Sequence, residues 1–320
     1  MNNSDSNKLN KDRDLDLRVD VAGIVWENPV TVASGTFSAR DTAEFYDLNE
    51  LGAVITKGIA SRPWEGNPTP RIAETYGGML NSVGLQNPGV DSFIKEELPY
   101  LKTLQTRIIA NVAGKTIEDY CEVAEKLDET AIDMMEINIS CPNIKEGGLS
   151  FGANPLMAAN ITKEIKARTK KPIIMKLTPN VTDITEIAKA VEAEGADAVS
   201  LINTLLGMKI DIHRKKPVLW NRMGGLSGPA VKPVAVRMVY QVRQAVKLPI
   251  IGLGGIMTGE DAVEFLMAGA DAIAVGTAAL LNPVAPVEIK KGLIEYMQRY
   301  GYRNLREIRE AFLKENENGL

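Results

Sequence analysis

A thiol and two amides stand where an apolar run of the chain ends, an arrangement suited to proton transfer beside a polar ligand. Cys141 follows the run 134–139 and precedes Pro142, which cannot continue a strand ladder. The predicted strand therefore ends near Cys141 and brings Asn138 and Asn143 to one edge of a sheet. Taken alone, Cys141 could equally be a small buried apolar residue.

Two lysines lie inside or directly after apolar runs, where an uncompensated charge is costly. Lys57 follows the run 53–56, and Lys176 lies within the run 173–177. Each therefore needs an anionic partner, or must give up its proton more easily than a solvated lysine does. A solvated surface lysine is the ordinary alternative, but the apolar neighbours argue against it at both positions.

Glycines and amides accompany these charges at the ends of other predicted strands. Gly254-Gly255 and Gly276-Thr277 end the last two strands, where exposed backbone N–H groups form a phosphate site in many barrels. An amide offers both a donor and an acceptor, so several amides would suit a ring with alternating C=O and N–H groups. Any one asparagine could instead be a turn or cap residue. The amides are Asn81, Asn111, Asn138, Asn143 and Asn203.

Eight short apolar runs alternate along the chain with segments that carry helix signals. Most runs are apolar on both faces, which is typical of parallel strands buried on both sides. Eight β/α units in one domain predict an α/β fold, a (β/α)8 TIM barrel, with an open doubly wound sheet as the alternative. The predicted strands are Pro29–Gly35, Ala53–Gly58, Ile108–Gly114, Asp133–Ser140, Ile173–Pro179, Ala198–Thr204, Pro249–Gly255 and Ala272–Ala278.

The helices between these runs are predicted from their caps and apolar stripes. Cys121 lies on the apolar face of one of them, so we expect it in the core. Gly195 and Gly269 stand where helices should end, just before the next strand. Capping-box patterns mark three helix starts: Thr116 with Asp119, Asp183 with Glu186, and Thr258 with Asp261.

Four segments depart from the β/α rhythm. Residues 1–16 are polar and charged and are predicted to be a disordered tail, with residues 17–320 forming a single barrel domain. Residues 17–27 alternate apolar and polar side chains, which predicts a short hairpin closing the bottom of the barrel. The insertions 59–88 and 205–227 both follow strand C-termini, so we expect them on the face where barrels place their chemistry.

Composition excludes several classes of function. The 37 basic residues nearly balance the 41 acidic ones, and no basic stripe with interleaved aromatics is present, so we expect no nucleic-acid partner. Two cysteines and one histidine are too few for a disulfide framework, for an iron–sulfur cluster or tetrahedral zinc held by the chain's own thiolates, or for a multi-histidine metal site. His213 lies in the second insertion and suits a surface position better than catalysis. No signal peptide or membrane span is predicted, which points to a cytoplasmic protein.

Together these motifs make the chain resemble the class 1 dihydroorotate dehydrogenases, from about Leu17 to the C-terminus. The resemblance is strongest to the NAD-linked type, class 1B, and the fumarate-linked class 1A is the alternative. Membrane-linked relatives carry serine as the base and an N-terminal membrane-binding extension, whereas here the base would be cysteine and no such extension is expected. The motifs are Val32–Phe37, Gly66–Arg71, Met79–Gly89, Asn138–Asn143, Lys176–Asn180, Ile202–Thr204 and Gly224–Gly228, with the two glycine pairs.

The resemblance implies an FMN enzyme that oxidises (S)-dihydroorotate to orotate in pyrimidine biosynthesis. Cys141 would be the base that takes a proton from C5 while hydride leaves C6 for the flavin N5. By motif, the FMN contacts are Ser34, Lys57, Gly58, Asn111, Asn138, Lys176, Ile202, Gly228, Gly254, Gly255, Gly276 and Thr277. The substrate contacts are Lys57, Asn81, Ser82, Val83, Gly84, Leu85, Asn138, Asn203 and Thr204. No metal site is expected.

The class 1B pattern also implies a partner subunit, which carries FAD and a [2Fe–2S] cluster and passes electrons to NAD. This chain would be the catalytic subunit, a homodimer within a heterotetramer, and the loop from Pro142 to Ala153 would close over the substrate. Two readings outside the family remain open at this point. One is a Schiff-base aldolase built on Lys57 or Lys176, and the other is a flavin- or nucleotide-binding barrel without turnover.

Overall fold

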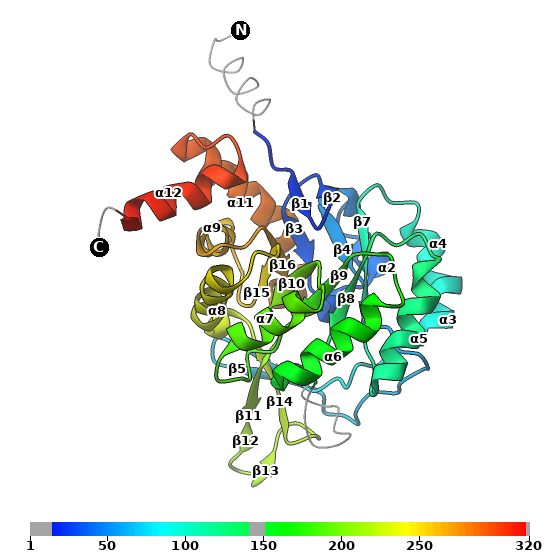
Figure 1. The fold of residues 1–320 in the computed structure, drawn as a ribbon. Helices are drawn as coiled ribbons and strands as arrows, with labels where there is room; N and C mark the ends of the chain where they lie inside the picture. Colours follow the sequence, from blue (N-terminus) through cyan, green and yellow to red (C-terminus); the bar gives the residue numbers. More distant parts are fainter. Residues whose placement is uncertain (1–14, 141–150, 318–320) are drawn as a thin grey trace.

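Eight parallel strands form the centre of the molecule (Figure 1), a computed structural model that describes residues 15–140 and 151–317. Their order around the sheet is β3-β16-β15-β10-β9-β8-β7-β4. The backbone N–H of Gly52, just before β4, donates to the carbonyl of Val30 in β3 at 2.9 Å and brings the two edges together. The strands are β3 (Val30–Val32), β4 (Ala53–Ile55), β7 (Arg107–Val112), β8 (Met134–Asn138), β9 (Ile173–Lys176), β10 (Ala198–Leu201), β15 (Ile250–Leu253) and β16 (Ala272–Val275).

The predicted (β/α)8 barrel is therefore confirmed, and each predicted run overlaps one of these strands. The strands end earlier than the sequence suggested. Ser34, Lys57 and Asn203 all come after the last paired residue of their strands. Because these residues follow the paired part of their strands, their side chains can face the loops at the C-terminal end, although the backbone N–H of Asn203 still donates to the carbonyl of Leu177 at 3.0 Å.

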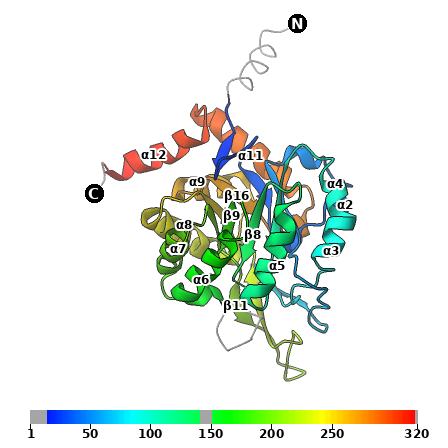
Figure 2. The same ribbon diagram turned by 45° about the vertical axis from the view of Figure 1, so that its right-hand side comes forward.

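Helices surround the barrel on its outer side (Figure 2). Thr116 and Thr258 form the predicted capping boxes, while Asp183 caps its helix by accepting from the N–H of Thr185. Cys121 is buried in the core between helices and strands, as predicted. The helices are α2 (Ala39–Thr42), α3 (Val90–Ser92), α4 (Leu98–Leu101), α5 (Ile117–Asp128), α6 (Pro155–Lys166), α7 (Ile184–Ala193), α8 (Lys232–Ala245), α9 (Gly259–Ala268), α10 (Thr277–Leu281), α11 (Ala285–Tyr300) and α12 (Leu305–Glu317).

A short hairpin fills the N-terminal end of the barrel. Strands β1 (Val19–Val21) and β2 (Ile24–Trp26) pair antiparallel, and Val21 and Trp26 are fully buried among the inward-facing residues of the barrel strands. The predicted closing hairpin is thus confirmed. Apolar side chains fill this end of the barrel. We therefore expect the site at the opposite end.

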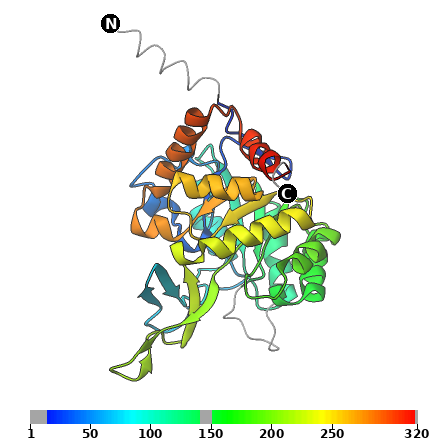
Figure 3. The same ribbon diagram turned by 90° about the vertical axis from the view of Figure 1, so that its left-hand side faces the viewer.

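The two insertions meet each other over that opposite end (Figure 3). Strands β5 (Ile72–Thr75) and β6 (Gly78–Asn81) come from the first insertion, and β11 (Leu205–Met208) and β14 (Met223–Ser227) from the second. They form one antiparallel sheet in the order β11-β14-β6-β5. A small arm, β12 (Ile210–Asp211) and β13 (Lys216–Pro217), extends it, and exposed His213 lies in the intervening turn, in agreement with the predicted surface position.

The first described residues and the start of α12 pack against α9 and α11. Leu15 packs against the cluster that contains Val263, Leu293 and Ile308, and the N–H of Asp16 donates to the carbonyl of Arg303 at 2.8 Å. These two residues of the predicted tail are therefore attached to the barrel. No helix within residues 15–140 and 151–317 is long and apolar enough to cross a membrane.

Candidate active site

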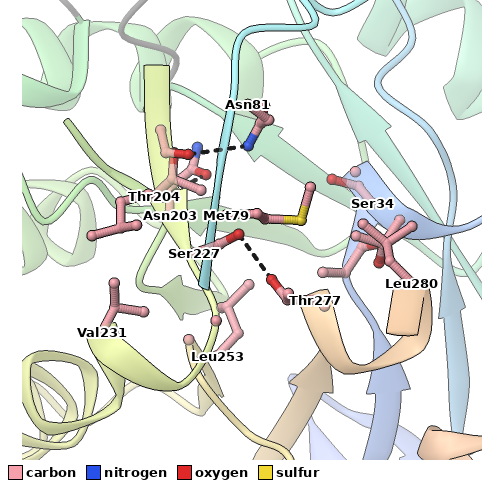
Figure 4. A pocket seen from close by; sticks show the side chains of 18 of the residues that line it. Ser34, Met79, Asn81, Asn203, Thr204, Ser227, Val231, Leu253, Thr277 and Leu280 are labelled. Carbon is pink, nitrogen blue, oxygen red and sulfur yellow. Dashed lines mark hydrogen bonds between the residues drawn. The ribbon is translucent and has the colours of Figure 1, made fainter. Parts of the chain in front are cut away.

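A cavity of about 270 Å³ opens at the C-terminal ends of the strands, beneath the sheet made by the insertions (Figure 4). Most predicted site residues line it. These are Ser34, Lys57, Asn81, Val83, Gly84, Leu85, Asn138, Lys176, Ile202, Asn203, Thr204, Gly228, Gly254, Gly255, Gly276 and Thr277. Apolar side chains that the sequence did not single out complete the wall, among them Met79, Leu253 and Leu280. The fold thus brings together residues that are more than 200 positions apart in sequence.

Four predicted residues stand apart from this lining. Gly58 and Asn111 lie behind the wall, where a Cβ on Gly58 would come within 3.2 Å of Oδ1 of Asn111. Ser82 is buried and its hydroxyl accepts from Nδ2 of Asn67 at 3.0 Å, so it supports the loop instead of facing the cavity. Cys141 lies outside the described residues, as does most of the loop that follows it.

The two lysines reach the cavity in different electrostatic states. Lys176, at the end of β9, is 4% exposed, and its Nζ donates to Oε1 of Glu136 at 3.1 Å. Burial lowers the pKa of Lys57 below its usual value, and no charged neighbour among the described residues offsets that effect. Lys176 thus pairs with an anion, and Lys57 has a lowered pKa. These are the two outcomes that were expected for lysines in apolar runs.

Glu136 is the centre of a buried polar cluster below the cavity. Its carboxylate is fully buried and accepts from three donors on β7, β9 and β10: Asn111 at 2.5 Å, Lys176 at 3.1 Å and Ser200 at 2.8 Å. Oδ1 of Asn111 is buried and has no hydrogen-bond partner among the described residues. Asn111 therefore retains an acceptor for a donor that the described part of the chain does not supply.

Ser140 organises the amides on the other side of the cavity. Its hydroxyl donates to Oδ1 of Asn138 at 2.9 Å and accepts from Nδ2 of Asn203 at 2.5 Å. Tyr120 holds the backbone of the same segment by donating its hydroxyl to the carbonyl of Asn138 at 2.7 Å. Because its oxygen is occupied by Ser140, Asn138 has its Nδ2 donor left for a ligand.

The ends of β15 and β16 form a cradle of bare backbone. Gly254 and Gly255 have φ values of 122° and 84°, in the left-handed region that glycine tolerates. A Cβ on Gly255 would lie 2.7 Å from Cβ of Lys232 and 2.9 Å from the carbonyl oxygen of Gly228. Beside this turn, Thr277 donates its hydroxyl to Oγ of Ser227 at 2.8 Å (Figure 4).

The motif Gly66–Arg71 supports the loop 82–85 from behind. Asn67 donates from its backbone N–H to the carbonyl of Val83 at 2.9 Å, and from Nδ2 to the carbonyl of Ser82 at 3.0 Å. Arg71 in turn donates to the carbonyl of Asn67 and to Oε1 of Gln86. A Cβ on Gly84 would lie 2.7 Å from the nitrogen of Asn67, so only glycine permits this contact.

The sequence interpretation missed three polar residues of the site: Glu136, Ser140 and Ser200. Glu136 carried a usable signal, since a carboxylate inside the apolar run 134–139 needs a partner for the same reason as a buried lysine. The two serines carried none, because a buried serine is common in any strand. Among the described residues, no group of histidine, cysteine, aspartate or glutamate side chains could hold a metal ion.

Comparison with known proteins connects this geometry to a family. The family model for dihydroorotate dehydrogenase matches residues 16–297. The chain belongs to the dihydroorotate dehydrogenase family. A relative from Alkaliphilus metalliredigens (strain QYMF) is 61% identical over 296 residues, which is 92% of this chain and 98% of that protein. One from Alkaliphilus oremlandii (strain OhILAs) is 62% identical over 291 residues, 91% of this chain and 96% of that protein.

A more distant relative, from Geotalea uraniireducens (strain Rf4), is 53% identical over 300 residues, covering 93% of this chain and 98% of that protein. All three are named dihydroorotate dehydrogenase B (NAD(+)), catalytic subunit. The predicted resemblance to the NAD-linked type of the dihydroorotate dehydrogenase family is therefore confirmed.

Proposed function

We propose that this chain is the catalytic subunit of an NAD-linked enzyme that oxidises (S)-dihydroorotate to orotate with FMN. One observation carries the proposal. A single cavity joins Lys57, Lys176 and the amides of Asn81, Asn138 and Asn203 to a glycine cradle at the ends of β15 and β16. Such a cavity offers a phosphate site at one end and matched polar groups for a planar ring and an anion at the other.

The residues present fit FMN on three grounds. Gly255 and its neighbours leave room for a phosphate, because a side chain there would collide with the backbone of Gly228. Asn111 keeps a buried acceptor without a partner among the described residues. Lys176 places a positive charge on the cavity wall, where it would offset negative charge on a reduced ring. FMN, when bound, would accept the hydride from C6 of the substrate.

The chain's own residues would bind and deprotonate the substrate. Lys57 faces the cavity without a carboxylate partner among the described residues, so it would hold the substrate carboxylate. Asn81 and Asn203 would bind the ring amides, since each side chain offers a donor and an acceptor. Cys141 follows directly after Ser140, and its thiolate would take the proton from C5. A thiol with an ordinary pKa of about 8.5 needs a nearby positive charge or a proton acceptor to do this near neutral pH.

Electrons would leave through a partner subunit that carries FAD and a [2Fe–2S] cluster and reduces NAD. The chain's two cysteines are too few to ligate such a cluster. We further propose a homodimer core within a heterotetramer, located in the cytoplasm. Co-expression with the genes of neighbouring subunits, followed by a comparison of NAD and fumarate as acceptors, tests this part. Reduction of fumarate but not NAD by the assembled complex would refute it.

The substrate assignment is tested with the purified chain. The protein should be yellow, and anaerobic (S)-dihydroorotate should bleach the flavin absorbance. Colourless protein, or a flavin that dihydroorotate leaves oxidised, would contradict the proposal and would favour a barrel without this turnover. Trapping of Lys57 or Lys176 by borohydride with a carbonyl substrate would instead indicate an aldolase.

The assignment of the base has its own test. Cys141→Ser should retain FMN and bind dihydroorotate, because the side chains are nearly isosteric, but should lose most turnover near neutral pH. Cys121→Ser is the matched control, since that thiol is buried in the core away from the cavity. Turnover like that of the wild type in Cys141→Ser would remove the thiol from the mechanism.

A further inference from the structure

Four neighbouring strands place one polar side chain each in a layer directly below the cavity. They are Asn111 on β7, Glu136 on β8, Lys176 on β9 and Ser200 on β10. Each stands two positions after an apolar residue of the inner barrel, and side chains two apart point to the same side of a strand. Those inner residues are Ile109, Met134, Ile174 and Ala198. The layer thus separates the apolar interior from the cavity floor.

Glu136 is a costly residue to keep in this layer. A fully buried carboxylate is stable only when its oxygens are hydrogen-bonded and its charge is compensated. Here Oε1 accepts from Asn111 and Lys176, and Oε2 accepts from Ser200. Lys176 is the cation of this set. The carboxylate does not line the cavity, so it acts on a ligand only through its donors.

The two lysines of the cavity therefore differ in whether a described carboxylate pairs with them. Among the described lining residues, Lys57 and Lys176 are the titratable ones, and Glu136 is the charged group that faces Lys176 from below. Lys57 stands without such a partner in the described part of the chain. A bound anion would thus pair with Lys57, whereas Lys176 already forms an ion pair with Glu136.

We propose that Glu136 is a positioning residue that holds the Lys176 side chain in place against the cavity, and holds the amide of Asn111 with its oxygen free. The inference rests on the proposed function, in which a flavin ring lies beside Lys176. In the wild-type protein Nζ of this lysine lies 3.1 Å from its counter-charge, Oε1 of Glu136. Negative charge on a reduced ring would then be offset by a side chain that is already in place.

Loss of the carboxylate charge should make this lysine a proton acceptor. In Glu136→Gln the buried amine has no counter-charge and holds its proton less tightly while the ring is oxidised and neutral. When two electrons reduce the ring, the new negative charge draws one proton from solvent onto the amine. The variant therefore takes up one more proton per two electrons than the wild type in the alkaline range.

The test is the pH dependence of the flavin midpoint potential, measured in FMN-loaded protein from about pH 6 to about pH 10. Glu136→Gln should give a steeper slope at the alkaline end, by one proton per two electrons. Ser200→Ala is the matched control, because it removes one hydrogen bond but leaves the carboxylate charge, and its slope should follow the wild type. A wild-type slope in Glu136→Gln, or equal changes in both variants, would overturn the proposal.

Dithionite reduces the flavin in this experiment, so the result does not depend on dihydroorotate as the substrate. If Glu136→Gln does not fold, the double variant Glu136→Gln/Lys176→Met decides, because it removes both buried charges together. It should recover soluble protein and a thermal midpoint closer to the wild type than the single variant. A double variant no more stable than Glu136→Gln would show that the two charges do not compensate each other.

Discussion

Nδ2 of Asn203 donates a hydrogen bond of 2.5 Å to Oγ of Ser140, although the two residues are 63 positions apart in the chain. The same hydroxyl donates to Oδ1 of Asn138 at 2.9 Å. One buried hydroxyl therefore fixes the orientation of both amides, and Oδ1 of Asn203 also accepts from the backbone N–H of Thr204 at 2.8 Å. The donor and acceptor pattern of the cavity depends on Ser140, a residue that itself does not line it.

Ser140→Ala should release both amides and weaken substrate binding. Loss of a buried hydrogen-bonding partner costs about 1–2 kcal/mol, so we expect KM for dihydroorotate to rise about tenfold. Thr162→Ala is the control, because Thr162 also has a buried hydroxyl but donates it within α6, to Ala158 at 2.7 Å. Steady-state kinetics should show the rise in KM for Ser140→Ala and no such rise for Thr162→Ala. An unchanged KM in Ser140→Ala would remove the hydroxyl from substrate recognition.

Gly255→Ala should abolish tight FMN binding. The new Cβ would lie 2.8 Å from the backbone nitrogen of Lys232 and 2.9 Å from the carbonyl oxygen of Gly228, so the turn at the end of β15 must move. Gly301→Ala is the matched control, because Gly301 also has a positive φ, of 76°, but faces open space. Both should lose about 1 kcal/mol of stability from backbone strain. Only the first should lose FMN affinity in a titration of the apoprotein.

Lys57→Met should lose activity and gain stability. We expect turnover to fall at least about a hundredfold, because the variant removes the charge that we propose binds the substrate carboxylate. In the ligand-free protein, burial lowers the pKa of Lys57, so the unfolded chain binds more protons than the folded one between the lowered value and about 10.4. Wild-type stability therefore rises with pH through that window.

The pH profile of unfolding checks this explanation. The advantage of Lys57→Met should be present at neutral pH and should shrink as pH rises, because the wild type no longer has to bury a charge. Denaturant unfolding of apoprotein at several pH values measures it. An advantage that stays constant with pH would assign the effect to packing alone.

Asp271→Asn should destabilise the barrel without changing the cavity. This carboxylate accepts from Arg309 of α12 at 2.7 Å, from Arg243 of α8, and from the backbone of Ile250 at 2.8 Å. Because two cations would lose a partly buried counter-charge, we expect a loss of about 3 kcal/mol in the free energy of unfolding. Asp91→Asn removes an exposed pair with Lys126 and should cost less than about 1 kcal/mol. Equal losses in the two variants would contradict this role for Asp271.

Local sequence patterns determined the architecture and most of the cavity wall. Runs apolar on both faces predicted the barrel, because a parallel strand is buried on both sides whatever its neighbours are. Lys57 and Lys176 could be selected because a charge among apolar residues must be resolved in any fold. Strand ends collect polar residues on one face of a barrel, so Asn138 and Asn203 were expected to lie together before any contact was known.

Tertiary structure alone decided which partner each of these residues has. The sequence indicated that Lys176 needs an anion, but only the register of β8, β9 and β10 selects Glu136 and adds Ser200 to it. Likewise, the pairing of β14 with β6 joins insertions whose paired residues Asn81 and Gly225 stand 144 positions apart. Which residues pair depends on which segments the fold places side by side. Local sequence patterns carry no information about the spatial distance between segments that are far apart in the chain.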